Sequence, residues 1–276
     1  MFRKSVTCLS FILLFSACGS RSINVDFHLP THQFLTPETT GEALGVKGSI
    51  NVHHAHKVSL ARTSQSSNVF SSDPGSIDLQ TDPKGDNSFG VGLNGAVGIW
   101  DRIDLLINKS NEAPWQGGLQ VQVLGSPDRK TLGLKLSIAG YAGYQSDREV
   151  ASDDFGSSSS ESDKFANVSA RTILRNTGAA LIVGYRKTER VLAYVNLHHQ
   201  NVEVESHINV EGGQSHNLDA DVENYGANVG LKLNFKGSSE NIFFQSELGF
   251  SRAKIQGALT ENNDLATWAF GLGAEY

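Results

Sequence analysis

Histidines are the residues of this chain whose spacing could bind a metal ion. Five of the nine form two groups, with His53, His54 and His56 in one and His198 and His199 in the other. Both groups fall in stretches whose alternation predicts β-strands, where adjacent side chains point to opposite faces of the sheet. We expect His53 and His198 to face one side of the sheet and the other three to face the opposite side. No carboxylate stands at a matching spacing, so we predict neither a metal site nor a bound cofactor.

Catalytic motifs are missing from the sequence. It contains no G-x-S-x-G, no H-E-x-x-H and no phosphate-binding glycine loop. Acidic residues do occur in predicted loops, at Asp153, Asp154, Asp219 and Asp221, and they keep a hydrolase with its active site on the loops as an alternative. Because no nucleophile or base motif accompanies them, the sequence predicts a non-enzymatic protein with no catalytic residue.

The first residues have the pattern of a secretory signal peptide. Arg3 and Lys4 precede an apolar run, Val6 to Phe15, which is too short to span a membrane as a helix. The cysteines are Cys8, inside this run, and Cys18, just after it. The mature chain is therefore expected to have no disulfide and no cysteine-based metal site.

The residues Phe15-Ser16-Ala17-Cys18 resemble the lipobox of bacterial lipoproteins, with Phe15 where leucine is usual. The resemblance implies that Cys18 is acylated on sulfur, becomes the N-terminus after cleavage and is then acylated on nitrogen. Gly19 permits sorting to the outer membrane, which implies the lipoprotein-sorting machinery as a partner. The alternative is an ordinary signal peptide.

The rest of the chain consists of alternating segments that predict β-strands. The last of them, Ala266 to Tyr276, places Trp268, Phe270 and Leu272 on one face and small or polar residues on the other. The 28 glycines and the single methionine suit closely packed strands, and no later apolar run approaches the roughly 20 residues of a spanning helix. The formal net charge of -6 argues against a nucleic-acid partner.

Counting these segments predicts ten strands. Four short turns, near Trp100, Asp128, Thr188 and Ser238, then lie at one end of the barrel, and the longer connections lie at the other. Twelve strands, which would break this segregation, and eight strands are the alternatives. The fold class is therefore all-β, an antiparallel up-and-down transmembrane β-barrel. We expect a signal peptide over 1–17, a polar periplasmic tether over 18–41 and the barrel domain over 42–276.

The alternation assigns side chains to the two faces of this barrel. Aromatic residues at the ends of the outward face predict two girdles, which consist of Phe89, Tyr144, Tyr225 and Phe250 at the loop side and Tyr185, Phe235 and Tyr276 at the turn side. The polar residues predicted to face the lumen are Lys47, Asp104, Lys135, Lys232, Glu247 and Glu275. Mixed charges inside a narrow barrel are expected to pair and fill it.

A terminal aromatic such as Tyr276 on an alternating last strand resembles the closing strand of bacterial outer-membrane β-barrels. The resemblance implies the outer membrane of a Gram-negative cell, lipid contact and the barrel-assembly machinery, with the lipid anchor of Cys18 in the inner leaflet; the oligomeric state stays open. A ten-stranded barrel also resembles the omptin proteases, which are ten-stranded outer-membrane barrels, although the sequence matches no omptin motif. The sequence thus predicts a non-enzymatic envelope lipoprotein, as a narrow passive channel or a structural or surface-contact protein. A soluble periplasmic barrel or sandwich lipoprotein is the second alternative.

Overall fold

The computed structural model describes residues 20–66, 77–80, 84–110, 113–128, 130–150, 152–153, 168–210, 215–236, 241–256 and 261–276. No helix that is long and apolar enough to cross a membrane occurs in these ranges. The strands are β1 (Ser20–Pro30), β2 (Val46–Ser66), β3 (Ile77–Gln80), β4 (Lys84–Trp100), β5 (Ile103–Ser110), β6 (Trp115–Leu124), β7 (Gly133–Val150), β8 (Ser152–Asp153), β9 (Val168–Thr188), β10 (Val191–Val210), β11 (His216–Lys236), β12 (Asn241–Gln256) and β13 (Glu261–Glu275).

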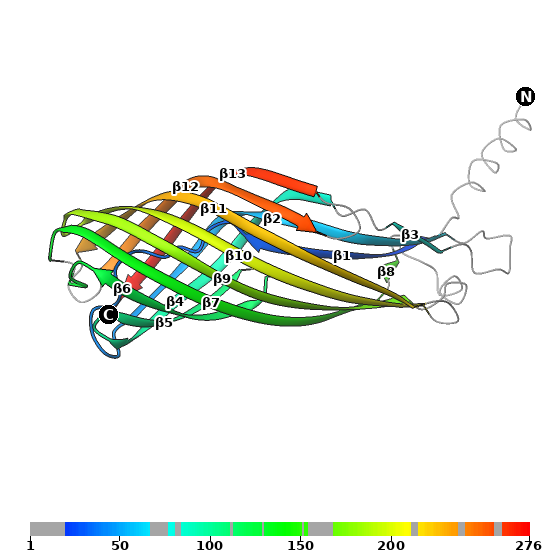
Figure 1. Ribbon diagram of the computed structural model, residues 1–276, viewed down its shortest axis with the longest axis horizontal. Helices are drawn as coiled ribbons and strands as arrows, with labels where there is room; N and C mark the ends of the chain where they lie inside the picture. Colours follow the sequence, from blue (N-terminus) through cyan, green and yellow to red (C-terminus); the bar gives the residue numbers. More distant parts are fainter. Residues whose placement is uncertain are drawn as a thin grey trace, which may run out of the picture.

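Antiparallel strands close into a barrel. Neighbours follow one another in the order β2, β4, β5, β6, β7, β9, β10, β11, β12 and β13, and β13 then pairs back with β2 (Figure 1). The closing ladder runs from Ala269 opposite His53 to Glu275 opposite Lys47. The predicted all-β, up-and-down barrel is confirmed, and this closed path has the predicted ten strands. The strand β1 joins the wall as an eleventh, which the sequence analysis did not predict.

The two ends of the barrel differ, and we name them for their connections. The turn end carries the tight connections after β4 and β9, the longer connection after β6, and Tyr276, whose backbone pairs with Val46 at 2.8 and 3.0 Å. The loop end is the opposite one. There β2, β9, β10 and β11, of 21, 21, 20 and 21 residues, extend well past the short strands β5 and β6, of 8 and 10 residues (Figure 1). These strands are about twice the length of the 9–11 residues that cross a bilayer.

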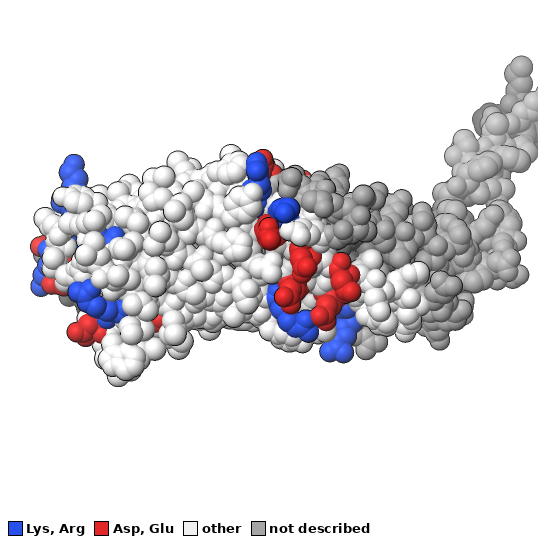
Figure 2. Space-filling view, in the orientation of Figure 1, with Lys and Arg blue, Asp and Glu red and all other residues white. Residues whose placement is uncertain are grey.

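The outside of the barrel is an apolar belt between two aromatic bands. Side chains such as Ile50, Val229 and Leu248 are 60, 63 and 64% exposed. All seven predicted girdle residues are exposed on this surface, and they are Phe89, Tyr144, Tyr225, Phe250, Tyr185, Phe235 and Tyr276. Figure 2 shows uncharged surface between charged side chains at the turn end and a charged belt near the middle of the molecule. This exterior suits a lipid environment, with the longest strands projecting beyond it.

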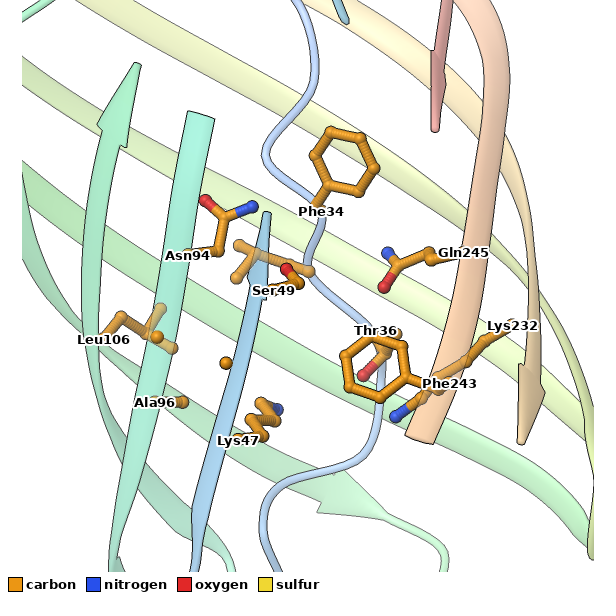
Figure 3. A pocket seen from close by; sticks show the side chains of 13 residues that line it. Phe34, Thr36, Lys47, Ser49, Asn94, Ala96, Leu106, Lys232, Phe243 and Gln245 are labelled. Carbon is orange, nitrogen blue, oxygen red and sulfur yellow. The ribbon is translucent and has the colours of Figure 1, made fainter. Parts of the chain in front are cut away.

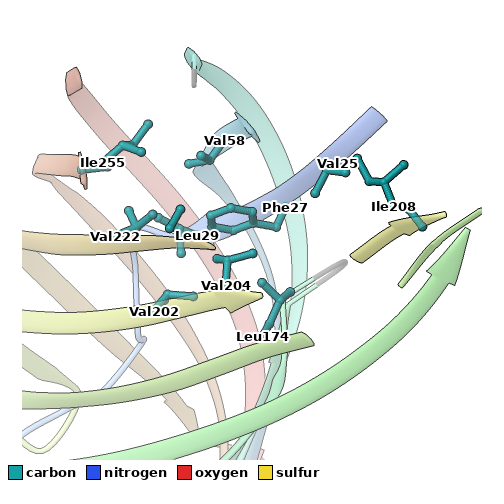
Figure 4. Close-up of a cluster of buried hydrophobic side chains, with 13 residues drawn as sticks. Val25, Phe27, Leu29, Val58, Leu174, Val202, Val204, Ile208, Val222 and Ile255 are labelled. Atoms are coloured by element: carbon teal, nitrogen blue, oxygen red, sulfur yellow. The ribbon is translucent and has the colours of Figure 1, made fainter. Parts of the chain in front are cut away.

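The projecting part has an apolar interior. Val25, Phe27 and Leu29 of β1 pack against inward side chains of β9 to β12, including Val204 and Ile255 (Figure 4). The three β1 side chains are at most 3% exposed. The strand β1 fits here because β2 changes partner along its length. The part of β2 near the turn end, up to His53, pairs with β13, and the part from Ala55 onward pairs with β1.

The tether predicted over 18–41 is not present in the described part of that segment. Residues 20–30 form β1, and the chain then turns into the lumen and descends to the turn end, where β2 begins. The alternating apolar residues Ile23, Val25, Phe27 and Leu29 indicate this strand in the sequence. The pattern was missed because the surrounding stretch is polar and contains prolines. Ser20 pairs with Ser66 at the loop end. The described chain therefore starts at the end opposite Tyr276, not beside it in the inner leaflet.

Candidate functional site: the occupied lumen

Residues 31–42, which we call the luminal segment, run down the inside of the barrel. Its side chains from Thr31 to Thr39 are buried, apart from the half-buried Leu35. Phe34 adopts a positive φ of 49°, which is uncommon for a bulky residue and indicates a backbone held by its surroundings. The segment is polar because the wall facing it is polar, and that composition resembles a solvated linker when only the sequence is read.

The upper part of the segment is held by wall amides and one carboxylate. Asn224 and Asn228 donate to the carbonyl oxygens of Pro30 and Thr31 at 3.3 and 3.1 Å. His32 Nδ1 lies 2.8 Å from Glu247 Oε2. The other oxygen of Glu247 accepts from the Tyr194 hydroxyl at 2.7 Å. All these contacts are buried, where an unmade hydrogen bond is costly, so they fix the height of the segment in the lumen.

The middle of the segment is held through its backbone. Gln120 Nε2 donates to the Thr36 carbonyl and Ser137 Oγ donates to the Pro37 carbonyl, both at 2.6 Å. Figure 3 shows Phe34 and Thr36 on the segment with side chains of β2, β4, β11 and β12 around them. A small cavity of about 30 Å³ remains between the segment and this wall.

Glu38 makes the strongest electrostatic contact of the segment. Arg186 donates to both carboxylate oxygens, from Nε and from Nη2, and Lys135 Nζ lies 2.8 Å from Oε1. The three side chains are between 0 and 3% exposed. A guanidinium that grips a carboxylate with two parallel bonds is among the strong charge-assisted contacts of proteins.

Asp104 holds the last turn of the segment. Its carboxylate accepts from the backbone N–H of Thr40 at 3.0 and 3.1 Å and from the Thr40 hydroxyl at 2.9 Å. Lys47 Nζ lies 3.3 Å from the same carboxylate and donates to the Glu38 carbonyl at 2.8 Å. Lys232 pairs with Glu275 and lies 4.2 Å from the centre of the Phe243 ring.

All six residues predicted to face the lumen do so. Asp104, Lys135, Lys232 and Glu247 are buried, and the side chains of Lys47 and Glu275 are 15 and 12% exposed. Their predicted pairing with one another holds only in part: Lys47 pairs with Asp104 and Lys232 with Glu275. Lys135 and Glu247 instead contact Glu38 and His32 of the luminal segment. Glu38 and Arg186 were missed. Arg186 could have been found from its parity, since it follows the outward Tyr185, whereas nothing in the sequence marked Glu38 as luminal.

The histidines are separated as expected, with one exception. His53 and His198 are buried in the lumen, His54 is half-buried on the outside and His199 is exposed. His56 is also buried, with Nε2 3.2 Å from Ser251 Oγ, which contradicts the outward prediction. The alternation fails because Ala55 and His56 are both buried where β2 exchanges β13 for β1. Within the described ranges, no three metal-binding side chains come together.

The remaining predicted residues do not form a shared site in the described part of the chain. Asp219 and Asp221 are exposed on β11, opposite Glu205 and Glu203. Asp153 is opposite Arg21 in the backbone ladder between β8 and β1. Cys18 and Asp154 lie outside the described residues.

Comparison with known proteins gives only distant structural similarity. No family model matches the chain, and no curated protein matches its sequence. The β domain of the Bordetella autotransporter BrkA is similar over 84% of this chain and 99% of its own, at 12% identity and a TM-score of 0.35. Ail, the attachment invasion locus protein of Yersinia pestis solved with sucrose octasulfate, gives the same coverage and identity at 0.32. The Escherichia coli outer membrane protease OmpT covers 93% of this chain and 95% of its own, at 9% identity and 0.31. Similarity at this level carries no argument about function.

Proposed function

We propose that this protein is an outer-membrane β-barrel of a Gram-negative cell which its own N-terminal segment keeps closed, and that it serves at the cell surface as a non-enzymatic structural or contact protein. The observation that carries the proposal is the burial of the luminal segment from Thr31 to Thr39. The segment uses the lumen as its binding site, so the interior is occupied before any solute arrives.

The membrane part of the proposal is supported by the exterior. A soluble barrel or sandwich would have to expose the whole belt of leucine, isoleucine and valine side chains to water, an apolar patch far larger than soluble monomers carry. A bilayer accommodates that belt, and the aromatic bands at its two edges match the two interfaces. The soluble alternative from the sequence analysis is therefore disfavoured.

The surface role is supported by the loop end. The strands β9 to β11 continue past the outer aromatic band and enclose an apolar core with β1. A wall with its own core forms a packed surface beyond the outer aromatic band. A passive channel, the other function that the sequence predicted, requires the luminal segment to leave.

A lipid on Cys18 enters the proposal through the lipobox resemblance. Two residues reach at most about 7 Å, and Ser20 lies at the loop end opposite Ser66, so an acyl group on Cys18 would lie on the loop side, beyond the outer aromatic band. Incorporation of labelled palmitate into the wild type, compared with Cys18→Ala, tests whether the residue is acylated.

Conductance in planar bilayers tests the closed state. The wild type is expected to give no steady current after insertion. A variant with residues 31–40 replaced by a glycine-serine segment of equal length is expected to give current steps, because the wall contacts of the segment are lost. Glu42→Ala is the matched control, since Glu42 is exposed at the same end, and it should stay silent. Heat-modifiable gel mobility shows that each variant is folded. Steady current through the wild type refutes the proposal.

A further inference from the structure

We propose that Arg186 and Lys135 form a binding site for a small carboxylate on the luminal wall, which Glu38 fills as a tethered ligand and which a free carboxylate takes when Glu38 is withdrawn. The inference rests on the closed barrel proposed above and names the ligand chemistry of the same lumen. Its starting point is the fork-shaped contact of Arg186 with both oxygens of Glu38, to which Lys135 adds a third bond. Arginine is suited to such planar two-point recognition, and lysine adds a point charge.

The wall positions both cations without help from Glu38. Arg186 Nη1 donates to the Glu189 carbonyl at 2.8 Å. Lys135 Nζ donates to the carbonyls of Ser126 and Asp128 at 2.7 and 3.1 Å. The two residues lie on the paired strands β9 and β7, where Arg186 is opposite Gly133 and Lys135 is opposite Gly184. Removal of Glu38 is therefore expected to leave a formed site, not a collapsed one.

The charge balance of the lumen shows why this site needs an anion. Within the described ranges, the buried or mostly buried charged side chains of the lumen are Lys47, Lys135, Arg186, Lys232, Glu38, Asp104, Glu247 and Glu275. Lys47 is paired with Asp104, Lys232 with Glu275, and Glu247 contacts His32 and Tyr194. Arg186 and Lys135 share Glu38, so its withdrawal leaves two buried cations facing no carboxylate. Buried charges without a partner are strongly unfavourable, which makes an incoming anion the expected replacement.

The shape of the site selects the ligand. The Glu38 side chain is a carboxylate on two methylene groups. Propionate and acetate therefore reproduce its charged end, whereas a neutral amide of the same shape does not. The site lies next to the turns that follow β6 and β9, because Ser126, Asp128 and Glu189 contact its cations. A ligand is therefore expected to enter from the turn end.

Chemical rescue of Glu38→Ala tests the site. The variant should lose its heat-modifiable mobility at a lower temperature than the wild type, and millimolar propionate should restore that temperature with saturation. Propionamide, and sodium chloride at equal ionic strength, should not. The wild type and Glu42→Ala should show no propionate response, since Glu38 fills the site in both.

Two results would overturn the inference: a Glu38→Ala protein as heat-stable as the wild type, or equal rescue by propionate and propionamide. If the variant does not fold unaided, its refolding yield from urea becomes the measurement, and a yield that propionate does not raise above propionamide is equally negative. Failure here is distinguishable from failure of the closed state, because current through the wild type leaves rescue of Glu38→Ala unaffected.

Discussion

Phe27→Ala distinguishes a docked β1 from a free tether. Phe27 is 1% exposed and sits in the apolar cluster of the loop end between Val25 and Leu29 of its own strand and side chains of β9 to β12. If residues 20–30 were a tether, truncation of this side chain would leave the barrel unchanged. The structure instead predicts a large loss of stability.

The magnitude follows from burial. Truncation of a fully buried phenylalanine costs about 3–5 kcal/mol in transfer and cavity terms. Asp26→Ala is the control on the same strand. Asp26 pairs with Lys57 at 2.8 Å, but the two side chains are 20 and 37% exposed, and an ion pair this exposed contributes about 0–1 kcal/mol. The two adjacent substitutions should therefore differ by several kcal/mol.

Urea unfolding in phospholipid vesicles, followed by tryptophan fluorescence, measures the global effect. Hydrogen exchange of the peptide that contains residues 20–30 measures the local one. We expect Phe27→Ala to lower the free energy of unfolding or, if β1 detaches before the barrel unfolds, to raise exchange in this peptide selectively. A Phe27→Ala protein that matches Asp26→Ala in both measurements would refute the docked strand.

Three further predictions test the wall and the direction of the chain. Val229→Arg, on the lipid-facing belt between Tyr225 and Phe235 of the two aromatic bands, should lower the stability of the inserted barrel by about 2–4 kcal/mol, and the same folding measurement would contradict the membrane assignment if the change were neutral. Gly230→Ala should cost about 1–3 kcal/mol by overpacking, because the new Cβ would lie 2.1 Å from the Tyr194 ring; an unchanged unfolding curve would argue against this packing. An epitope inserted before Ser20 should bind antibody on intact cells, whereas one inserted after Ala43 should bind only after the outer membrane is opened; the reverse pattern would invert the barrel.

The barrel wall could be predicted because its pattern is local. Alternation assigns the faces of a strand directly, so the outward Phe235 and the inward Lys232 were placed correctly from sequence. The tight turns near Trp100 and Thr188 fixed which end is which, and the closed ten-strand path followed.

The contents of the lumen could not be predicted in the same way. The luminal segment pairs with no strand, so no period marks it, and its polar composition is that of a linker. Glu38 meets Arg186 across 148 positions of sequence, and no spacing rule links such residues. His56 failed for a related reason: the exchange of strand partners at Ala55 breaks an alternation that the sequence continues.

The closing ladder between β13 and β2 has a consequence for assembly. Once the ring of strands is closed, the luminal segment could enter it only by threading through one open end. Its preceding strand, β1, is already fixed in the wall at the loop end. The strands β1 and β2 are near in sequence and pair early by proximity, whereas β13 must find β2 across more than 200 positions, a contact of the kind that forms slowly. The seam is therefore expected to shut last, around a segment already in place. The barrel is then assembled together with its contents, and the lifetime of the closed state is set by the rate at which that seam opens.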